Sequence, residues 1–147
     1  MFCSMGDYNK TLSDCVTSPL LIDVDTLISK VDEMVGEGLL DHTDNIRSRP
    51  VYIFHGTQDT TVLPEVGKKA ETMYKHYGAD LKTEYSIEAE HGMPTNNESN
   101  QACTKNETPF INYCEYDAAF EALSHISSKA PLNPPGVMNP DHVFSYK

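Results

Sequence analysis

Two acid–base side chains stand in loops that each follow a predicted strand. Asp59 lies in the polar turn after the apolar run 51–55, and His91 follows the alternating run 81–87. Active sites of open α/β sheets form at the carboxyl ends of the strands, so we expect the two side chains about 3 Å apart. The carboxylate would orient the imidazole and stabilise its protonated form. The alternative is that Asp59 only forms a turn and that His91 is merely polar.

The other histidines give weaker evidence for chemistry. His55 is also a candidate functional residue, but its place at the end of a strand, before Gly56, favours a packed and hydrogen-bonded ring. The remaining histidines have no matching partners in the sequence and are interpreted as surface residues: His42, His76, His125 and His142. No spacing of His or Cys is typical of a metal site, so we expect no metal and no other cofactor.

Apolar periodicity predicts the elements that position Asp59 and His91. The i, i+3, i+4, i+7 pattern after residue 24 is that of an amphipathic helix, with Asp23 or Asp25 as its cap. A continuous β-branched and aromatic run predicts a buried parallel strand, and strict alternation predicts a more exposed one. In chain order we predict a disulfide-closed loop over 1–22, a helix from 24 that ends at Gly36 and Gly38, a strand over 51–55, a helix from 64 that ends at Gly78, a strand over 81–87, a loop over 89–115, a helix over 117–128 and a non-helical Pro-rich tail over 129–147.

The predicted fold class is α/β, with one domain over 1–128. Helices and strands alternate along the chain, which is typical of a parallel sheet. Two strands do not make such a sheet, since a mean sheet holds about five or six. We therefore predict part of a doubly wound sheet with flanking helices. Unpaired edges on its apolar strand predict self-association.

Composition limits the classes of partner. The 147 residues include 11 Lys and Arg against 22 Asp and Glu, so the net charge is −11. Such a chain is poorly suited to nucleic acid or to an anionic membrane surface, because both need clustered basic residues. No stretch approaches the roughly 18 apolar residues of a membrane helix. The 39% hydrophobic content is enough for one ordinary core.

Cysteines and sequons indicate an oxidising compartment. Four cysteines allow three pairings, and proximity along the chain favours Cys3 with Cys15 and Cys103 with Cys114. Asn-x-Ser/Thr sequons, which are candidate glycosylation sites, begin at Asn9, Asn97 and Asn106. The first seven residues, however, contain neither the basic nor the apolar part of a signal peptide. Either the chain is cytosolic with free thiols, or Met1 is an internal methionine of a longer secreted protein; the other features favour the second.

Three segments together carry a family resemblance. They read RPVYIFHGTQDTTV at 49–62, EHGMPT at 90–95 and INYCEYDAA at 111–119. In this combination the chain resembles the secreted polyhydroxybutyrate depolymerase family of α/β-hydrolases, over roughly residues 1–128. The resemblance implies that Asp59 is the triad acid, that His91 is the triad base, and that Cys103 and Cys114 close a loop beside the histidine.

The resemblance also implies a serine nucleophile on a Gly-x-Ser-x-Gly elbow, which this sequence lacks. The nearest imitation surrounds Ser4, but an elbow needs a strand before it, and only three residues precede Ser4. We therefore expect the nucleophile, and the groups that stabilise the oxyanion, to lie outside this chain.

The sequence leaves three functional hypotheses. The first is the acid-and-base part of a secreted serine esterase, with a polyester or a short hydroxyacyl ester as its substrate. Alone, such a chain is expected to be inactive, because it lacks the nucleophile. The second is a non-catalytic secreted binding module derived from the same fold. The third is an unrelated small α/β domain in which Asp59 and His91 are structural.

Overall fold

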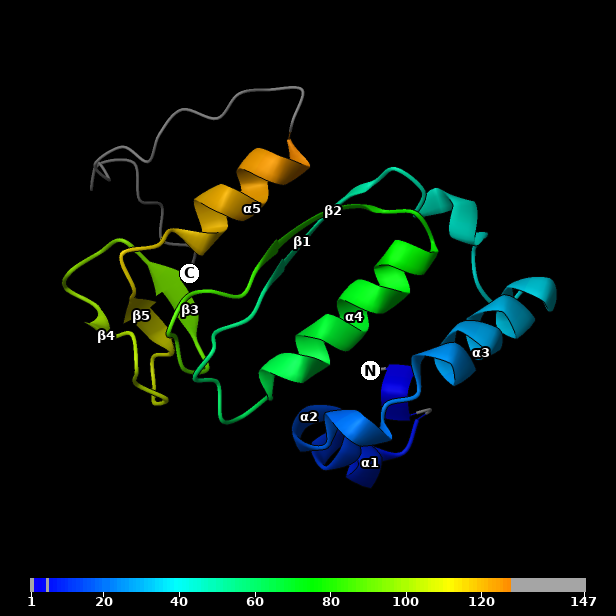
Figure 1. Cartoon of the computed structure of the whole chain (residues 1–147), viewed down its shortest axis with the longest axis horizontal. Coiled ribbons are helices and arrows are strands. Elements are labelled where there is room, and N and C mark those ends of the chain that lie inside the picture. Colours follow the sequence, from blue (N-terminus) through cyan, green and yellow to red (C-terminus); the bar gives the residue numbers. More distant parts are fainter. Residues whose placement is uncertain (1, 5, 128–147) are drawn as a thin grey trace, which may run out of the picture.

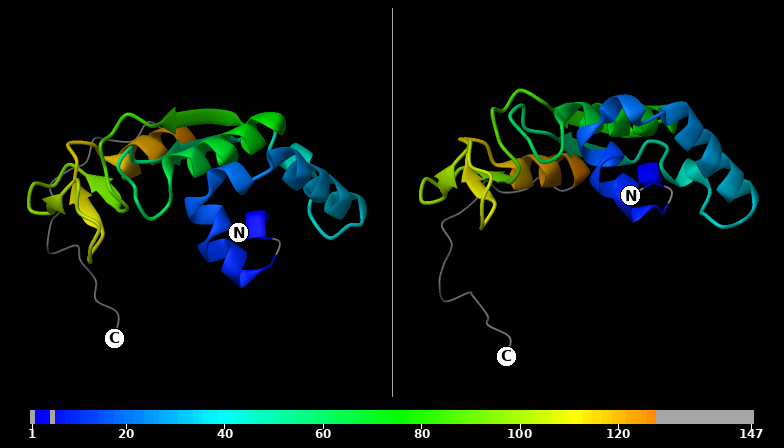
Figure 2. Two further views of the ribbon diagram at one scale, coloured as in Figure 1. Left: turned by 60° about the horizontal axis from the view of Figure 1, so that its bottom comes forward. Right: turned by 90° about the horizontal axis from the view of Figure 1, so that it is seen from below.

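The computed structural model describes residues 2–4 and 6–127 of the chain. The predicted Pro-rich tail over 129–147 lies outside these residues. Figures 1 and 2 show an elongated arrangement, with a small three-stranded sheet at one end and helix α3 (Val24–Gly36) at the other. A parallel pair of strands lies between these ends and is accompanied by helices.

The central unit is a β–α–β crossover. Strands β1 (Pro50–Phe54) and β2 (Asp80–Glu84) pair in parallel, with Pro50 opposite Asp80 and Phe54 opposite Glu84. Helix α4 (Pro64–His76) connects them and begins at a proline, whose fixed φ suits a first helical turn. In Figure 1 the strand pair runs between α4 and helix α5 (Ala118–Ile126). The predicted α/β class with parallel strands is confirmed.

Strand β2 is shorter than the predicted run 81–87. The strand ends at Glu84, whose carboxylate accepts hydrogen bonds from both the backbone N–H and the hydroxyl of Ser86, at 2.6 Å each. Among the described residues, no further strand pairs with the outer edge of β1 or of β2.

The apolar core lies between α3 and α4. Of the two predicted caps, Asp23 is the one that caps α3, because its side chain accepts hydrogen bonds from the N–H groups of Asp25 and Thr26. Tyr77, at the end of α4, packs into this core and donates its hydroxyl proton to Asp32 at 3.2 Å. Burial raises the pKa of Tyr77 to about 12. The buried cluster consists of Ile22, Val24, Leu27, Ile28, Val31 and Tyr77.

The prediction of a disulfide-closed loop over 1–22 is right about the disulfide and wrong about the loop. Its described residues, 2–4 and 6–22, include four short helical pieces: η1 (Phe2–Ser4), α1 (Tyr8–Leu12), α2 (Asp14–Thr17) and η2 (Pro19–Leu21). Asp7 caps α1 by accepting hydrogen bonds from the N–H groups of Asn9 and Lys10. Each piece is too short to show a helical apolar pattern, so periodicity could not reveal it. The predicted disulfide between Cys3 and Cys15 is present.

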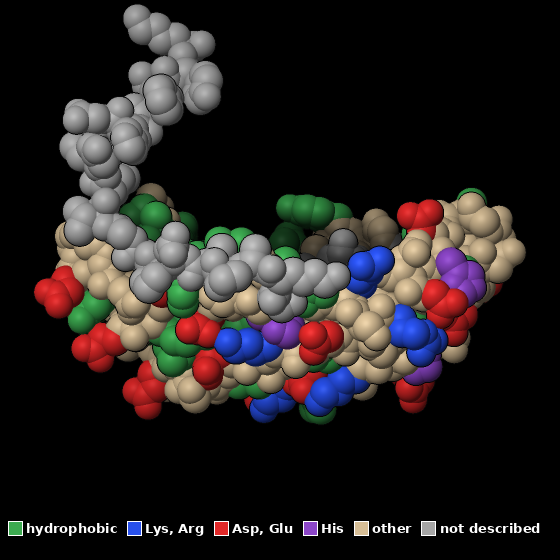
Figure 3. Space-filling model, turned by 90° about the horizontal axis from the view of Figure 1, so that it is seen from above, with side chains coloured by type: hydrophobic (Ala, Val, Ile, Leu, Met, Phe, Trp, Pro, Cys, Tyr) green, Lys and Arg blue, Asp and Glu red, His purple; other side chains and the backbone are tan. Residues whose placement is uncertain are grey.

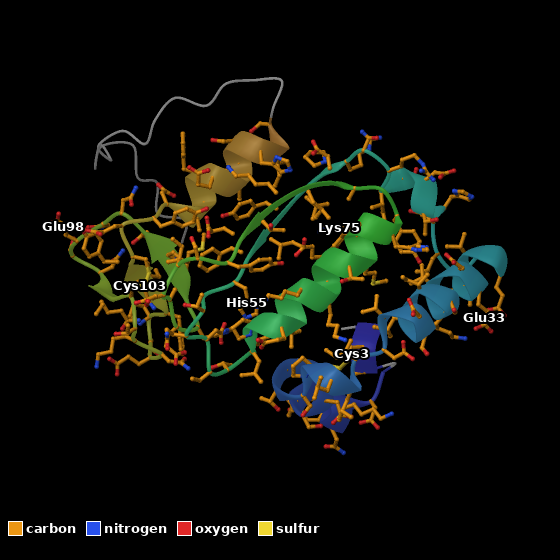
Figure 4. All side chains as sticks on the ribbon, viewed as in Figure 1. Cys3, Glu33, His55, Lys75, Glu98 and Cys103 are labelled. Carbon is orange, nitrogen blue, oxygen red and sulfur yellow. A yellow bond between two sulfur atoms is a disulfide. The ribbon has the colours of Figure 1, made fainter. Side chains whose placement is uncertain are left out.

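The prediction of a loop over 89–115 is also wrong. Three strands lie in it: β3 (Met93–Thr95), β4 (Gln101–Ala102) and β5 (Ile111–Tyr113). They form a parallel sheet in the order β3-β5-β4. Strands of two or three residues are too short to show alternation. The second predicted disulfide, Cys103 with Cys114, is present beside this sheet (Figure 4).

Helix α5 is fixed to the strand pair by polar and aromatic contacts. The Tyr116 ring stacks on Phe54 at 5.9 Å, and its hydroxyl is hydrogen-bonded to that of Tyr52. Lys82 on β2 forms an ion pair with Glu121 at 2.6 Å. Tyr116 and α5, which follow the small sheet in the chain, therefore pack against β1 and β2.

Charged side chains of both signs are scattered over the face shown in Figure 3. In Figure 3, Asp and Glu side chains spread along the whole length of the face, with Lys and Arg among them. None of the helices in the described part of the chain is long and apolar enough to cross a bilayer. Within residues 2–4 and 6–127, no group of His, Cys, Asp and Glu is arranged to hold a metal ion.

Candidate active site

Asp59 is fixed in the turn that follows β1. Its Oδ1 accepts hydrogen bonds from the backbone N–H groups of Thr61 at 3.0 Å and Val62 at 2.8 Å. Only 8% of the residue is exposed. These two bonds orient the carboxylate, so that Oδ2 is available for another donor.

His91 is that donor. Its Nδ1 lies 2.9 Å from Asp59 Oδ2. Because a carboxylate oxygen accepts, Nδ1 carries the proton, and the basic lone pair of the neutral ring is on Nε2. The His91 side chain is 43% exposed, in contrast to the buried carboxylate. The arrangement can accept a proton at Nε2 while Asp59 holds the ring.

The two loops approach closely because residue 56 is a glycine. A Cβ at Gly56 would lie 2.7 Å from the carbonyl carbon of Ala89 and 2.9 Å from the Ala89 Cβ. The loops are also joined by hydrogen bonds from Gln58 N–H to the Ala89 carbonyl at 3.2 Å and from Thr57 N–H to the Ile87 carbonyl at 2.9 Å. Ala89 is fully buried. A side chain at position 56 would therefore separate Asp59 from His91.

Glu90 is a second link between the loops. Its carboxylate accepts hydrogen bonds from the N–H of Thr60 at 3.1 Å, the hydroxyl of Thr60 at 2.8 Å and the N–H of His91 at 3.0 Å. Partial burial raises the pKa of Glu90, but these hydrogen bonds outweigh burial, so the pKa lies below its ordinary value. The Glu90 N–H donates to the Cys103 carbonyl at 3.0 Å, which connects His91 to the disulfide-closed loop.

An open hollow of about 460 Å³ lies beside the exposed histidine ring. It is lined by His91, Gly92, Met93 and Phe110, and the side chains of Met93 and Phe110 are partly exposed. A smaller apolar cavity of about 140 Å³, between the Cys3–Cys15 disulfide and helices α3 and α4, shares no lining residue with it. The hollow at His91 thus combines a basic ring with apolar walls.

Similar proteins were found by sequence. No family model matches the chain. The chain is 31% identical over 127 residues to a poly(3-hydroxybutyrate) depolymerase of Delftia acidovorans, a match that covers 85% of this chain and 26% of that protein. It is 30% identical over 86 residues to a polyhydroxybutyrate depolymerase of Talaromyces funiculosus, covering 56% of this chain and 25% of that protein. The chain belongs to the polyhydroxybutyrate depolymerase-like family.

Solved structures of depolymerases have the same fold over this part. The crystal structure of PHB depolymerase from Penicillium funiculosum matches 94% of this chain with a TM-score of 0.78 and 22% identity. A PHB depolymerase complexed with an R3HB trimer matches 86% of it with a TM-score of 0.74 and 22% identity. The chain spans about a quarter of the curated depolymerases and about two fifths of the solved ones. Its membership of this family excludes an unrelated small α/β domain.

The other histidines in the described part of this depolymerase-like chain do not line the hollow. His55 is packed and hydrogen-bonded, as predicted, with its Nε2 2.6 Å from the Val62 carbonyl oxygen. His42 and His76 are exposed, as predicted. The interpretation of His125 as a surface residue without a partner is wrong, because its ring is half-buried and hydrogen-bonded to the carbonyl of Asp80 at 2.9 Å. His142 lies outside the described residues.

The other predicted site residues have varied surroundings. Ser4 is buried next to Cys3 in η1 and does not line the hollow at His91. The three sequon asparagines, Asn9, Asn97 and Asn106, are all exposed, and their glycosylation stays a prediction. The Asn106 amide donates to the Thr61 hydroxyl at 2.9 Å, beside the turn that carries Asp59.

Sequence reasoning missed Glu90 and Asn112. Asn112 is fully buried, and its amide donates to the carbonyls of Lys105 at 2.8 Å and Cys103 at 3.2 Å. A Cβ at Gly92 would lie 3.0 Å from the nitrogen of this amide, so Asn112 packs closely against the backbone just after His91. For Glu90 the only sequence signal was its place next to His91, and for Asn112 it was a polar residue between Ile111 and Tyr113.

Proposed function

We propose that this chain carries the acid and the base of a secreted serine ester hydrolase that acts on poly(3-hydroxybutyrate) or on short hydroxyalkanoate esters. The observation that carries the proposal is the hydrogen bond of 2.9 Å between Asp59 and an exposed His91. Buried acid, oriented imidazole and free Nε2 are the features of an acid–base pair that activates a hydroxyl nucleophile.

In the proposed reaction the nucleophile is a serine outside these 147 residues. Its hydroxyl proton passes to His91 Nε2 while its oxygen attacks the ester carbonyl carbon, and the carbonyl oxygen becomes the oxyanion of a tetrahedral intermediate. Backbone N–H groups outside this chain stabilise that oxyanion. When the intermediate collapses, the ester C–O bond breaks, the leaving alcohol takes the proton from His91, and an acyl-enzyme remains.

Water completes the cycle. His91 takes a proton from the water as its oxygen attacks the acyl carbon, and returns that proton to the serine oxygen as the acid product leaves. Throughout, Asp59 keeps the His91 Nδ1–H tautomer and stabilises the imidazolium. The chain without its serine partner should hydrolyse esters slowly at best.

The substrate class is supported by two features. The relatives are named as depolymerases of this polyester, and one solved relative is complexed with an R3HB trimer. In this chain the hollow beside His91 has apolar walls from Met93 and Phe110, which suit a hydroxyacyl chain better than a charged ester.

Secretion and assembly are part of the same proposal. Both disulfides, together with the exposed sequons, support an oxidising compartment, with the signal peptide upstream of Met1. The outer edges of β1 and β2 are proposed to pair with strands outside these residues, or with a second copy when those strands are missing. Light scattering on the 147-residue chain should detect oligomers, and a cooperative monomer would refute this point.

The function is tested by p-nitrophenyl butyrate hydrolysis on two forms. One is the 147-residue chain, and the other is the same chain extended upstream to the next in-frame start. We expect activity only in the extended form, with loss in His91→Ala and Asp59→Asn and no loss in the exposed control His76→Ala. If neither form is active while the short chain folds cooperatively, the non-catalytic binding module replaces the esterase.

A further inference from the structure

A second histidine contacts the same carboxylate as His91. His55 Nε2 lies 3.4 Å from Asp59 Oδ2 and 2.6 Å from the carbonyl oxygen of Val62. The His55 side chain is only 11% exposed, against 43% for His91. Figure 4 shows His55 where the chain leaves β1, next to the first turn of α4. Asp59 therefore has one histidine partner at the hollow and one in the interior.

The bond to Val62 determines the tautomer of His55. A carbonyl oxygen only accepts, so the proton of the neutral ring must be on Nε2. The other nitrogen, Nδ1, faces α4, where a Cβ at Gly67 would approach it to 2.8 Å. The basic atom of His55 is thus directed at a helix backbone. The ring is unsuited to exchange protons with a substrate, and only His91 can be the base.

The contacts of His55 close the turn that carries Asp59. Its backbone N–H donates to the Glu84 carbonyl at 3.0 Å, which fixes the residue at the end of the strand pair. Its ring donates to the carbonyl of Val62, and the N–H of Val62 donates to Asp59 Oδ1 at 2.8 Å. The imidazole therefore ties the end of the strand pair to Val62, the last residue of the turn over 56–62. The hydrogen bond from Val62 N–H then fixes the Asp59 carboxylate relative to His55.

We propose that His55 is a positioning residue for the Asp59–His91 pair. It holds the turn over 56–62 in the form that presents Asp59 Oδ2 to His91 Nδ1. This role rests on the proposed function for its effect on the reaction, but the geometric part concerns this chain alone. This role requires a hydrogen-bond donor at the place of Nε2, whereas a role in packing alone requires only a side chain of suitable shape.

Three substitutions of His55 distinguish a positioning role from a packing role. His55→Phe keeps a planar aromatic ring at this position and removes the donor. His55→Gln places its amide nitrogen the same number of bonds from Cβ as Nε2, so it restores the donor. His55→Asn places the amide nitrogen one bond too near, at the level of Nδ1. The matched control is His125→Phe, which breaks another histidine-to-carbonyl hydrogen bond, the one to Asp80.

The first readout is the tautomer of His91 in the ¹⁵N-labelled 147-residue chain. Long-range ¹H–¹⁵N spectra separate the Nδ1–H form from the Nε2–H form, with His91→Ala assigning the signals. We expect the Nδ1–H form in the unchanged chain, in His55→Gln and in His125→Phe, and a mixture in His55→Phe and His55→Asn. Far-UV circular dichroism checks that each variant is folded.

The second readout is ester hydrolysis by the extended form. A carboxylate displaced by about 1 Å should lower kcat about 10- to 100-fold in His55→Phe and His55→Asn, with KM little changed and recovery in His55→Gln. If a folded His55→Phe keeps the His91 Nδ1–H signal and its kcat, His55 only packs and the inference is wrong. If His91→Ala leaves hydrolysis unchanged, the proposed function fails instead, and the tautomer spectra still decide whether His55 holds the pair.

Discussion

Replacing Gly56 by alanine should separate the two loops of the candidate site. The added Cβ would overlap the carbonyl oxygen of Ala89 and would lie 2.7 Å from its carbonyl carbon. Ordinary contacts begin at 3.4 Å, so the carbon alone requires the backbones to part by about 0.7 Å and the oxygen requires more. Ala89 cannot move freely, because it is fully buried and its carbonyl accepts the N–H of Gln58. Overpacking of this kind costs about 1–3 kcal/mol.

The assay is urea denaturation of the extended form, in which the edges of β1 and β2 are proposed to be paired, combined with the His91 tautomer spectra. Gly56→Ala should lower the free energy of unfolding by about 1–3 kcal/mol and convert the single Nδ1–H form of His91 into a mixture. Gly36→Ala is the matched control, because no atom lies within 4 Å of its added Cβ and its φ is not positive. There, alanine should be neutral or stabilise the helix end by up to about 1 kcal/mol.

The result that would refute this reasoning is a Gly56→Ala chain as stable as Gly36→Ala, with His91 still in the Nδ1–H form. Close approach at residue 56 would then have no part in positioning the pair. Loss of stability with an unchanged His91 tautomer would also contradict it, because the loops would have adjusted without moving the carboxylate from the imidazole.

The remaining predictions concern the supports of the pair. Glu90→Gln should weaken the link between Thr60 and His91. Because the folded-state pKa of Glu90 is lowered, the stability that its carboxylate contributes is fully present above the unfolded pKa of 4.5 and is lost as pH falls through the folded-state pKa. Urea denaturation midpoints measured from pH 6 to 3 should therefore fall more steeply in the unchanged chain than in Glu90→Gln. Asn112→Leu should cost about 2–4 kcal/mol in urea denaturation, because two carbonyls lose their donors, and an unchanged midpoint would contradict this. The double variant Cys103→Ser, Cys114→Ser should lose about 3 kcal/mol under non-reducing conditions; equal stability with and without the bond would show that the loop needs no brace.

The long elements were predictable because each has a repeated pattern. The helix after Asp23 and the helix after Pro64 show apolar side chains at helical spacing, and the run before His55 has the composition of a buried strand. The juxtaposition of Asp59 and His91 followed from topology, since parallel strands place the loops after them at one edge. Their catalytic roles stay predictions.

The short elements and supporting contacts were not predictable, for a physical reason. Strands of two or three residues and helices of four or five show no period, so the small sheet and the N-terminal helices were interpreted as loops. The contacts of Glu90 with Thr60, and of Asn112 with Lys105, depend on how separate segments pack. His55 illustrates how far the sequence could predict the site, because it indicated a packed ring but not the contact of that ring with Asp59.

The central claim is that Asp59 and His91 activate a serine from outside these 147 residues, and fluorophosphonate labelling of the extended form tests it most directly. The reagent forms a covalent bond with an activated serine, which peptide mass spectrometry then locates. We predict a single labelled serine outside residues 1–147, with labelling lost in His91→Ala and retained in His76→Ala. A label on Ser4 or on another serine of this chain, or labelling that does not depend on His91, would contradict the account.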